Sequence, residues 1–306
     1  MVYTAPMPPL LEAKHLTKHY GTTIALESVS FQVREGITGL LGANGAGKTT
    51  VIKLFLGLLK PTSGSVQVLG REAYGSVEVR ARLGYMPEHD CLPGSMTASD
   101  FLNHMAQISG LPPAYARTRA ADVFRHVGLE EERYRAMGEY SSGMKQRVKL
   151  AQALVHDPFL VLLDEPTAGL DPGGRQEMLD LIRRTSKDFG VSVMLSSHLM
   201  ADIERTCDRI IVLDGGHLAR EGTVSGFTQE TQTLFIEVDD HRSELMVALA
   251  NRGIDASVDG PSLLVELEND DQYDAIRDAI VESNASLRKL APGRHRLTDI
   301  FQSPQE

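Results

Sequence analysis

The segment GANGAGKTT at residues 42–50 has the residue types and spacing of a phosphate-binding loop, G-x-x-x-x-G-K-[ST]. Its glycines let the backbone fold tightly, so that N–H groups and the N-terminus of the following helix face an anion. Lys48 can reach the β- and γ-phosphates of a nucleotide, Thr49 can ligate Mg²⁺, and Thr50 can cap nearby backbone or phosphate. A purely structural glycine-rich turn is the alternative. The predicted nucleotide-binding residues are Gly42, Ala43, Asn44, Gly45, Ala46, Gly47, Lys48, Thr49 and Thr50.

The segment FLVLLDEP at residues 159–166 places two carboxylates at the end of an apolar strand. Ligands bind at the carboxyl ends of strands in open α/β sheets, so this segment is expected to lie beside the phosphate loop. Asp164 is predicted to hold Mg²⁺, through water, and Glu165 to orient and polarise a water for phosphoryl transfer. A base in this position contributes about 10²–10⁴-fold to the rate. The alternative is a pair of carboxylates that cap a helix.

Alternating strand and helix patterns are expected to position these two segments. Apolar strand patterns occur at 35–42, 159–164 and 191–198, with a helix pattern between the last two, which predicts a parallel sheet with right-handed crossovers. Patterns of period two on either side of the first strand predict an antiparallel β region. The helix after the phosphate loop is expected to be stopped by Lys60 and Pro61.

A helical block interrupts this alternation between about residues 89 and 157. Thr97 followed by Asp100 has the spacing of a capping box and predicts a helix start. After residue 228 the pattern changes again, to the order β-α-β-β-α-β of a ferredoxin-like unit, with LTDIF at 297–301 as a possible closing helix. We therefore predict a first domain over residues 1–228 and a small α+β accessory domain over 229–306.

The overall composition restricts the classes of partner. The formal net charge of -10 argues against broad binding to a nucleic acid backbone, which requires clustered Lys and Arg. Cys91 and Cys207 lie far apart and lack a CxxC or Cys/His companion, which indicates a reducing compartment and no zinc site. No segment resembles a signal peptide or a membrane span, so we expect a soluble chain whose membrane role, if any, requires a partner.

Taken together, these segments resemble the ABC-type ATPases. GANGAGKT matches the Walker A motif, YSSGMKQR at 140–147 the signature motif, LVLLDEP the Walker B motif, GLD at 169–171 the D-loop and SSH the switch histidine, in the order of that family. The resemblance covers about residues 10–225. It implies an α/β fold: a P-loop NTPase core with an antiparallel β subdomain and an inserted helical subdomain. The C-terminal ferredoxin-like α+β domain follows this ATPase domain. The resemblance also implies ATP and Mg²⁺ as ligands.

The resemblance assigns roles to further residues. Tyr20 matches the aromatic residue that stacks on adenine, although an exposed tyrosine at a turn is more often structural. His198 matches the switch histidine that contacts the γ-phosphate, and with Glu165 and Lys48 it completes the predicted catalytic set. Asp171 matches the D-loop aspartate, which in the family helps to shape the opposite site of the dimer.

Residue 88 departs from the family pattern, because the expected Gln of the Q-loop is a Glu. A carboxylate here can bind Mg²⁺ or the attacking water, but it repels a triphosphate unless the metal is present. An outward-facing Glu88 paired with a basic residue is the alternative. The predicted metal ligands are thus Thr49, Asp164 and Glu88.

The signature segment also departs from the usual L-S-G-G-Q, since Tyr140, Ser142 and Met144 replace the usual Leu, one Gly and the Gln. Ser141 and Gly143 keep the positions that contact phosphate. Segments with SxGM and QR resemble the exporter branch, whose permeases are encoded separately and which includes drug, lipid and polysaccharide exporters. By this resemblance, Ser141, Ser142, Gly143 and Met144 act on ATP held by another subunit.

The predicted function is an ATP-hydrolysing motor subunit whose ATP-driven dimer closure powers export through a separate transmembrane permease. The dimer is expected to pair either identical or different chains. The subunit is expected on the cytoplasmic face of the membrane, held there by its permease. No binding to nucleic acid is expected. Three alternatives stay open: an ABC ATPase of another machine, a nucleotide sensor without turnover, and an importer ATPase. The single acidic cassette disfavours the first, Glu165 and His198 disfavour the second, and only the SSGM signature and the C-terminal unit disfavour the third.

Overall fold

The structure is a computed structural model that describes residues 9–227, 230–267 and 272–294. The chain forms two compact units, Met1–Val224 and Ser225–Glu306. This division falls close to the predicted boundary after residue 228. The helix expected at 297–301 lies outside the described residues. Each unit is described by itself below.

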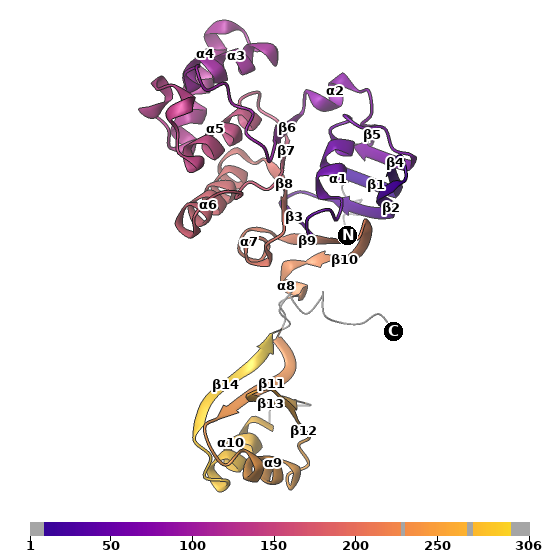
Figure 1. Cartoon of the computed structure of the whole chain (residues 1–306), viewed down its shortest axis with the longest axis vertical. Helices are drawn as coiled ribbons and strands as arrows, with labels where there is room; N and C mark the ends of the chain where they lie inside the picture. Colours follow the sequence, from indigo (N-terminus) through magenta and orange to yellow (C-terminus); the bar gives the residue numbers. More distant parts are fainter. Residues whose placement is uncertain (1–8, 228–229, 268–271, 295–306) are drawn as a thin grey trace, which may run out of the picture. The chain divides into compact units, whose positions relative to one another are not determined.

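An antiparallel sheet forms the first layer of unit 1 (Figure 1). Its strand order is β2-β1-β4-β5, with β1 (Leu11–Tyr20) paired to β2 (Thr23–Val33) and to β4 (Ser63–Val68), and β5 (Arg71–Glu72) at the edge. Alternating residues of β2 are buried, because successive side chains of a strand point to opposite faces. The antiparallel β region expected from the sequence is therefore present.

The second sheet has six strands in the order β10-β9-β3-β8-β7-β6. Neighbours from β9 to β6 are parallel, and β10 pairs antiparallel to β9 as the predicted hairpin. The parallel strands are almost fully buried, as expected where both faces of a sheet are covered. The strands are β3 (Ile37–Leu41), β6 (Leu83–Met86), β7 (Leu160–Leu163), β8 (Ser192–Ser197), β9 (Arg209–Asp214) and β10 (His217–Thr223).

The strand order brings three chain segments to one edge of the sheet. β8 lies between β3 and β7, with Leu41 paired to Ser197 and Leu163 to Leu195. The carboxyl ends of all three strands therefore lie side by side. The segments that follow β3, β7 and β8 are the phosphate loop, the acidic pair and the SSH segment, which meet at this edge as expected for an open α/β sheet.

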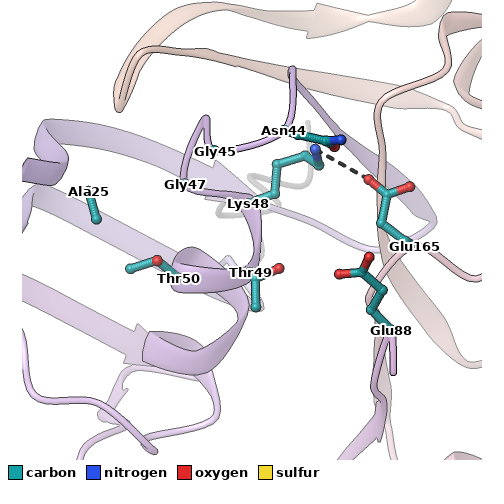
Figure 2. A pocket seen from close by; sticks show the side chains of 9 residues that line it. All are labelled: Ala25, Asn44, Gly45, Gly47, Lys48, Thr49, Thr50, Glu88 and Glu165. Carbon is teal, nitrogen blue, oxygen red and sulfur yellow. Dashed lines mark ion pairs between the residues drawn. The ribbon is translucent and has the colours of Figure 1, made fainter. Parts of the chain in front are cut away.

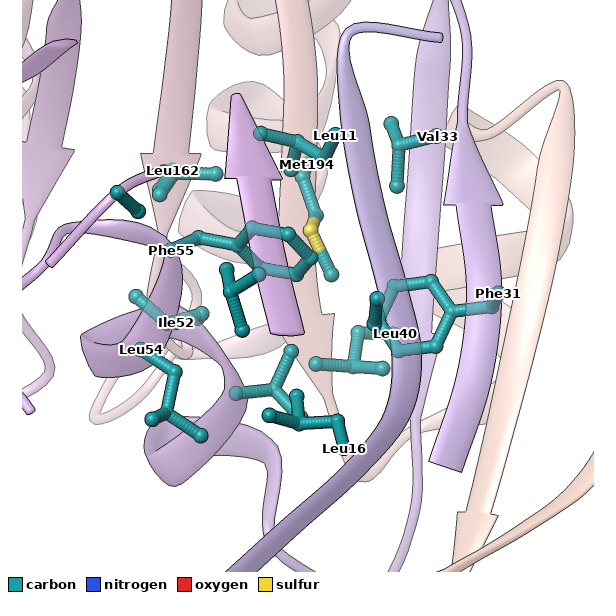
Figure 3. Close-up of a cluster of buried hydrophobic side chains, with 14 of the residues drawn as sticks. Leu11, Leu16, Phe31, Val33, Leu40, Ile52, Leu54, Phe55, Leu162 and Met194 are labelled. Atoms are coloured by element: carbon teal, nitrogen blue, oxygen red, sulfur yellow. The ribbon is translucent and has the colours of Figure 1, made fainter. Parts of the chain in front are cut away.

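A hydrophobic core fills the space between the antiparallel sheet, helix α1 (Lys48–Phe55) and the parallel sheet (Figure 3). Phe55 of α1 packs edge-on against Phe31 of β2, with ring centroids 5.8 Å apart. Met194 of β8 belongs to the same cluster. The phosphate loop is thus anchored at its helix by the two largest layers of the unit.

Helix α1 ends at Phe55 and not at the predicted stop near Lys60. Gly57 has a φ of 65°, and a Cβ at this position would lie 2.1 Å from the carbonyl oxygen of Ala73. The chain can therefore turn closely against the Ala73 backbone only with glycine here. The expectation was wrong because Gly57, not Pro61, ends the helix.

The predicted helical block is present in unit 1, where α3, α4 and α5 gather to one side of the parallel sheet (Figure 1). α3 (Ala98–Ile108) begins at the predicted cap, since the Thr97 hydroxyl accepts from the Asp100 N–H at 3.1 Å. α5 (Ser142–Leu154) contacts β6 and β7, and so connects the block to the sheet. The other helices of unit 1 are α2 (Val77–Arg80), α4 (Pro113–Val127), α6 (Pro172–Phe189) and α7 (Met200–Thr206), with 3-10 turns at Glu132–Tyr134 and Met137–Glu139.

The short helix α8 (Val224–Phe227) spans the division between the units, and the elements after it have the predicted order β-α-β-β-α-β. The antiparallel sheet of unit 2 has the strand order β12-β13-β11-β14, with α9 and α10 packed together on a separate core. No helix in the described ranges is long and apolar enough to cross a membrane. The elements are β11 (Glu230–Val238), α9 (Arg242–Ala250), β12 (Ala256–Asp259), β13 (Ser262–Glu266), α10 (Gln272–Glu282) and β14 (Leu287–Arg294).

Candidate active site

A pocket of about 340 Å³ lies where the phosphate loop faces the ends of the neighbouring strands (Figure 2). It brings together the loop, Glu88 and Glu165 of the acidic pair, which are distant in the sequence, whereas Asp164 lies buried behind Thr49 and does not line the pocket. Ala25 of β2 also lines the pocket and was not predicted. The lining residues are Ala25, Asn44, Gly45, Gly47, Lys48, Thr49, Thr50, Glu88 and Glu165.

The phosphate loop has the conformation that its glycines predict. Gly47 has a φ of 101°, and a Cβ there would lie 2.6 Å from Leu26 Cδ2 and 2.7 Å from the Ala25 carbonyl oxygen. Only glycine therefore fits between the loop and β2. Gly47 directly precedes Lys48, the first residue of α1, so the N–H groups at the start of this helix open toward the pocket.

Lys48 is buried at the wall of the pocket with its ammonium group held by three oxygens. Its Nζ donates to the carbonyls of Gly42 at 2.8 Å and Ala43 at 3.1 Å, and lies 3.2 Å from Glu165 Oε1. Gly42 and Ala43 thus act through their carbonyls and do not line the pocket, and the side chain of Ala46 is buried. These three of the nine predicted loop residues shape the loop.

The buried carboxylate of Asp164 is linked to helix α1 and to strand β8. Its Oδ1 accepts from the Thr49 hydroxyl at 3.2 Å and from the Ser196 hydroxyl at 2.7 Å. The Ser196 oxygen also accepts from the N–H of Glu165 at 2.9 Å. Ser196 therefore fixes both carboxylate residues, although sequence reasoning did not single it out. The available signal was a polar residue at the end of the apolar strand before His198.

Glu165 occupies a backbone conformation that non-glycine residues rarely adopt, with a φ of 47°. Its Oε2 is 2.9 Å from Nδ1 of His198, and its Oε1 has no hydrogen-bond partner among the described residues, although Lys48 lies nearby. A buried carboxylate oxygen without a hydrogen bond is able to accept one from a water in the pocket. The structure thus brings the three predicted catalytic residues, Lys48, Glu165 and His198, into one connected group.

Of the three predicted metal ligands, Thr49 and Glu88 line the pocket, and Asp164 lies directly behind the Thr49 hydroxyl. Thr49 and Asp164 are in hydrogen-bond contact, and in Figure 2 the Glu88 carboxylate and the Thr49 hydroxyl point toward one another across the pocket. Mg²⁺ prefers hydroxyl, carboxylate and water oxygens and is held by one or two carboxylates together with substrate phosphates. The residues therefore fit a magnesium ion bound with a nucleotide.

A second hollow, of about 710 Å³, contains the signature segment. It shares no lining residue with the first pocket among those described. Ser141 caps α5 by accepting from the N–H of Met144 at 3.3 Å, and Asp171 caps α6 by accepting from that of Gly174 at 3.2 Å. The hollow is lined by Gly128, Leu129, Glu132, Ser141, Ser142, Gly143, Met144, Arg147, Gly169, Leu170, Asp171, Gly173, Gly174 and Glu177.

Tyr20 does not line either hollow. It lies at the end of β1, is 47% exposed, and its ring lies 5.3 Å from the ammonium of Lys18. The ring is thus partly exposed with Lys18 over one face, and its assignment to adenine stacking stays a prediction.

Known proteins resemble the chain over most of its length. A family model described as ABC transporter matches residues 26–168. The ABC transporter ATP-binding protein YdbJ of Bacillus subtilis is 33% identical over 96% of this chain and 94% of its own length. The bacitracin transport ATP-binding protein BcrA of Bacillus licheniformis is 37% identical over 70% of each chain, and the methionine import protein MetN of Brucella abortus is 37% identical over 72% of this chain and 61% of its own.

Solved structures give the same result. The ATP binding subunit of an ABC transporter matches with 33% identity and a TM-score of 0.63, over 71% of this chain and 91% of that one. The dimeric structure of the bacterial ABC transporter cassette MJ0796 matches with 25% identity and a TM-score of 0.64, over 71% and 100%. The same cassette is also known in a post-hydrolysis state bound to ADP and Pi. The chain belongs to the ABC transporter family as an ATP-binding subunit, an ATPase that uses ATP and Mg²⁺.

Proposed function

We propose that this ATPase drives export through a separate transmembrane permease, with two ATPase subunits closing head to tail around ATP. The observation that carries the proposal is the separation of the two hollows. Lys48, Thr49 and Glu165 line one hollow, whereas Ser141 and Asp171 line the other. The signature of one chain is therefore available to the nucleotide of a second chain, and the dimeric MJ0796 cassette supports such pairing.

Within each site the residues divide the work of phosphoryl transfer. Lys48 and the N–H groups of the loop bind the β- and γ-phosphates, and Tyr20 stacks on the adenine. Thr49, Asp164 and Glu88 would hold Mg²⁺, which would supply positive charge beside the phosphate oxygens.

Glu165 receives a hydrogen bond from the attacking water and orients it toward the γ-phosphate. This assignment is supported by Oε1, whose one recorded contact among the described residues is the ion pair with Lys48 at 3.2 Å, and by His198, which lies 2.9 Å from the other carboxylate oxygen. Because little covalent chemistry is required of the protein, positioning and charge neutralisation supply most of the rate.

The catalytic assignment is tested by replacing Glu165 with Gln. The amide keeps the shape of the side chain but is a poor acceptor for the water, so hydrolysis should fall by at least about 10²-fold while ATP binding is retained. Steady-state ATPase assays and titration with a fluorescent ATP analogue measure the two effects. Size-exclusion chromatography with ATP should show the variant as a dimer. Wild-type turnover in this variant would exclude Glu165 as the base.

Export is favoured over import by the signature segment, while the relatives of the chain include both a bacitracin transport protein and an import protein. BcrA, which the chain resembles, is a bacitracin transport protein, and Ser141 to Met144 give the SSGM form of the signature. MetN, an import protein, is equally similar in identity, so import is the second candidate. Reconstitution with the cognate permease in vesicles with outward-facing ATPase subunits separates them. Export predicts ATP-dependent accumulation of substrate inside the vesicles.

The proposal places the subunit on the cytoplasmic face of the membrane through its permease. Co-purification of the tagged chain from membranes is expected to recover a multi-span protein and a second ATPase subunit. Mass spectrometry of the recovered complex also reports whether the two ATPase chains are identical. Recovery only in the soluble fraction, without such a partner, would contradict the assignment to a transporter.

A further inference from the structure

The helix that carries the signature segment is attached by two lysines to the loop that carries Glu88. We define this loop, residues 87–91, as the Glu88 loop; it follows β6 and precedes the helical block. Lys149 of α5 donates from Nζ to the carbonyl oxygen of Glu88 at 2.8 Å and to that of His89 at 3.4 Å. Lys145, one turn earlier, forms an ion pair of 2.9 Å with Asp90. Three consecutive loop residues are thus held from one face of α5.

The two contacts differ in their environment. The Lys145–Asp90 pair is partly exposed, so screening by water makes it weak. Lys149 is only 2% exposed, and a charged group at such a position is costly unless polar atoms compensate for lost water. The compensating atoms here are the backbone carbonyls of the Glu88 loop. Neighbouring carboxylates add negative charge, namely Asp164 after β7 together with Glu88 and Asp90 of the loop.

Burial lowers the pKa of Lys149, and these negative neighbours oppose the shift. An aliphatic side chain would fill the same space without a desolvation cost. Because Lys149 is neither exposed nor part of either hollow among the lining residues described, solubility and direct ligand contact do not explain its charge. Its contact with the backbone of Glu88, whose side chain lines the nucleotide pocket, does explain it.

We propose that Lys149 is a positioning residue for ATP hydrolysis. It fixes the backbone at Glu88, so that the Glu88 carboxylate is held toward Thr49 at the wall of the pocket. The same lysine connects the signature helix, which is proposed to contact ATP of the partner chain, to the nucleotide pocket of its own chain. This inference rests on the function proposed above.

The test replaces Lys149 with Met in the full chain, which keeps the length of the side chain and removes the donor. A misplacement of about 1 Å in a catalytic constellation costs up to about 10²-fold, so kcat is expected to fall about 10- to 100-fold with little change in KM for ATP. Hydrogen–deuterium exchange of residues 87–91 should accelerate in the same variant. Unchanged kcat together with unchanged exchange would overturn the proposal.

Arg119→Met is the matched control. Arg119 of α4 donates to the backbone carbonyls of Leu154 at 3.2 Å and Val155 at 3.3 Å. These carbonyls lie at the C-terminal end of α5, away from the contacts with the Glu88 loop. The control is expected to lower thermal stability while exchange of residues 87–91 and kcat stay near wild type. An equal loss of kcat in both variants would assign the effect to general destabilisation and refute the proposal.

A double-mutant cycle shows whether Lys149 acts through Glu88. In a Glu88→Ala chain the carboxylate is absent, so adding Lys149→Met is expected to lower kcat by much less than it does in the wild type. An equal factor in both backgrounds would refute the assignment.

Asp90→Asn is a second variant that tests the connection between α5 and the Glu88 loop. Because Asp90 is exposed, the substitution preserves folding. Hydrogen–deuterium exchange of residues 87–91 should rise moderately, and unchanged exchange would contradict the connection.

Glu165→Gln, measured in parallel, reports on the proposed function alone. If Glu165→Gln retains wild-type turnover while Lys149→Met behaves as expected, the base assignment fails and the positioning role stands. If Glu165→Gln loses turnover while Lys149→Met keeps wild-type kcat and exchange, Glu165 stays the base and the positioning role of Lys149 is refuted.

Discussion

At the scale of single residues, the site depends on a serine that bridges two carboxylates. Ser196 donates to Asp164 and accepts from the N–H of Glu165, so one hydroxyl sets the positions of the proposed metal ligand and the proposed base. Glu165 in turn lies in the left-handed region, where a non-glycine residue costs about 1–2 kcal/mol. The hydrogen bond from its N–H to Ser196 helps to hold this conformation.

Ser196→Ala is therefore expected to affect both stability and hydrolysis. The change leaves a buried N–H without its acceptor, which costs about 1–3 kcal/mol in the free energy of unfolding. Displacement of Glu165 should lower kcat about tenfold or more. Urea denaturation and steady-state ATPase assays measure the two quantities. Ser192→Ala, at the other end of β8, is the control and should leave kcat near wild type; equal kcat in the two variants would contradict the bridge.

At the scale of elements, three of the functional segments begin a helix. Lys48 opens α1, Ser141 caps α5 and Asp171 caps α6. The N–H groups at a helix start are unpaired within the helix and attract anions or capping oxygens. The nucleotide pocket and the signature hollow therefore use the same physical device in two separate hollows of unit 1.

Ser141→Ala separates the capping role from the proposed role in a second site. Loss of the cap to the Met144 N–H should cost about 1 kcal/mol of stability. ATP binding to the monomer should be unchanged, because Ser141 does not line the nucleotide pocket, whereas hydrolysis at saturating ATP should fall strongly. Calorimetry, ATP titration and ATPase assays give the three values.

Thr97→Ala supplies the control for this change. Thr97 caps α3 in the same way, by accepting from the Asp100 N–H, and lines neither hollow. It is expected to lose a similar stability of about 1 kcal/mol without loss of hydrolysis. If the two variants hydrolysed ATP equally, Ser141 would be a helix cap and nothing more.

The junction between α5 and β6 is predicted to be sensitive to acid. His156 follows α5, and its Nε2 donates to the Leu83 carbonyl at 3.0 Å. Burial lowers the pKa of His156 below 6.5, so below that pH the unfolded state binds more protons than the folded state. The stability that the neutral His156 side chain contributes is therefore fully present above pH 6.5. It is lost as the pH falls through the pKa of His156 in the folded state, which is lower than its pKa in the unfolded state.

His156→Gln should reduce this acid sensitivity, since the amide can still donate to Leu83 and does not titrate. The urea midpoint, measured between pH 7.5 and 5, is expected to fall less steeply than in the wild type. His19→Gln, at an exposed position of β1, should keep the wild-type slope. A wild-type slope in His156→Gln would assign the acid sensitivity to other groups.

At the scale of the whole molecule, negative charge is concentrated in one unit. Ser225–Glu306 contains 16 of the 41 acidic residues but only 7 of the 31 basic residues, so it carries nearly all of the net charge of -10. The ATPase unit is close to neutral by itself. The argument from charge against nucleic acid therefore applies mainly to the accessory unit.

Ending the chain after residue 228 tests the proposed domain boundary. The two units have separate hydrophobic cores, so the shortened chain is expected to fold and to bind ATP as the full chain does. It should also elute earlier from an anion-exchange column, because most of the negative charge is removed. Circular dichroism and ATP titration check the fold. An insoluble or unfolded product would show that the boundary is wrong.

The sequence by itself determined the chemistry of the site, because the types and spacing of neighbouring residues specify that chemistry. Short patterns of glycine residues and of alternating polar and apolar residues predicted four features. These are the phosphate loop, the strand before Asp164, the cap at Thr97 and the order of elements in unit 2. The helix end at Phe55 was missed because a contact with Ala73, distant in the chain, requires Gly57 to turn there.

The tertiary structure alone decided which side chains meet. It placed β8 between β3 and β7, which gave Ser196 its bridging position, and it directed Lys149 to the Glu88 backbone. It also separated the signature hollow from the nucleotide pocket. The hydrogen bonds of Ser196 and Lys149 join residues about 30 to 60 positions apart, and the pairing of Leu41 with Ser197 joins residues still more distant. Periodicity reports only on neighbours in the chain, so it does not identify the partner of a buried hydroxyl or ammonium group.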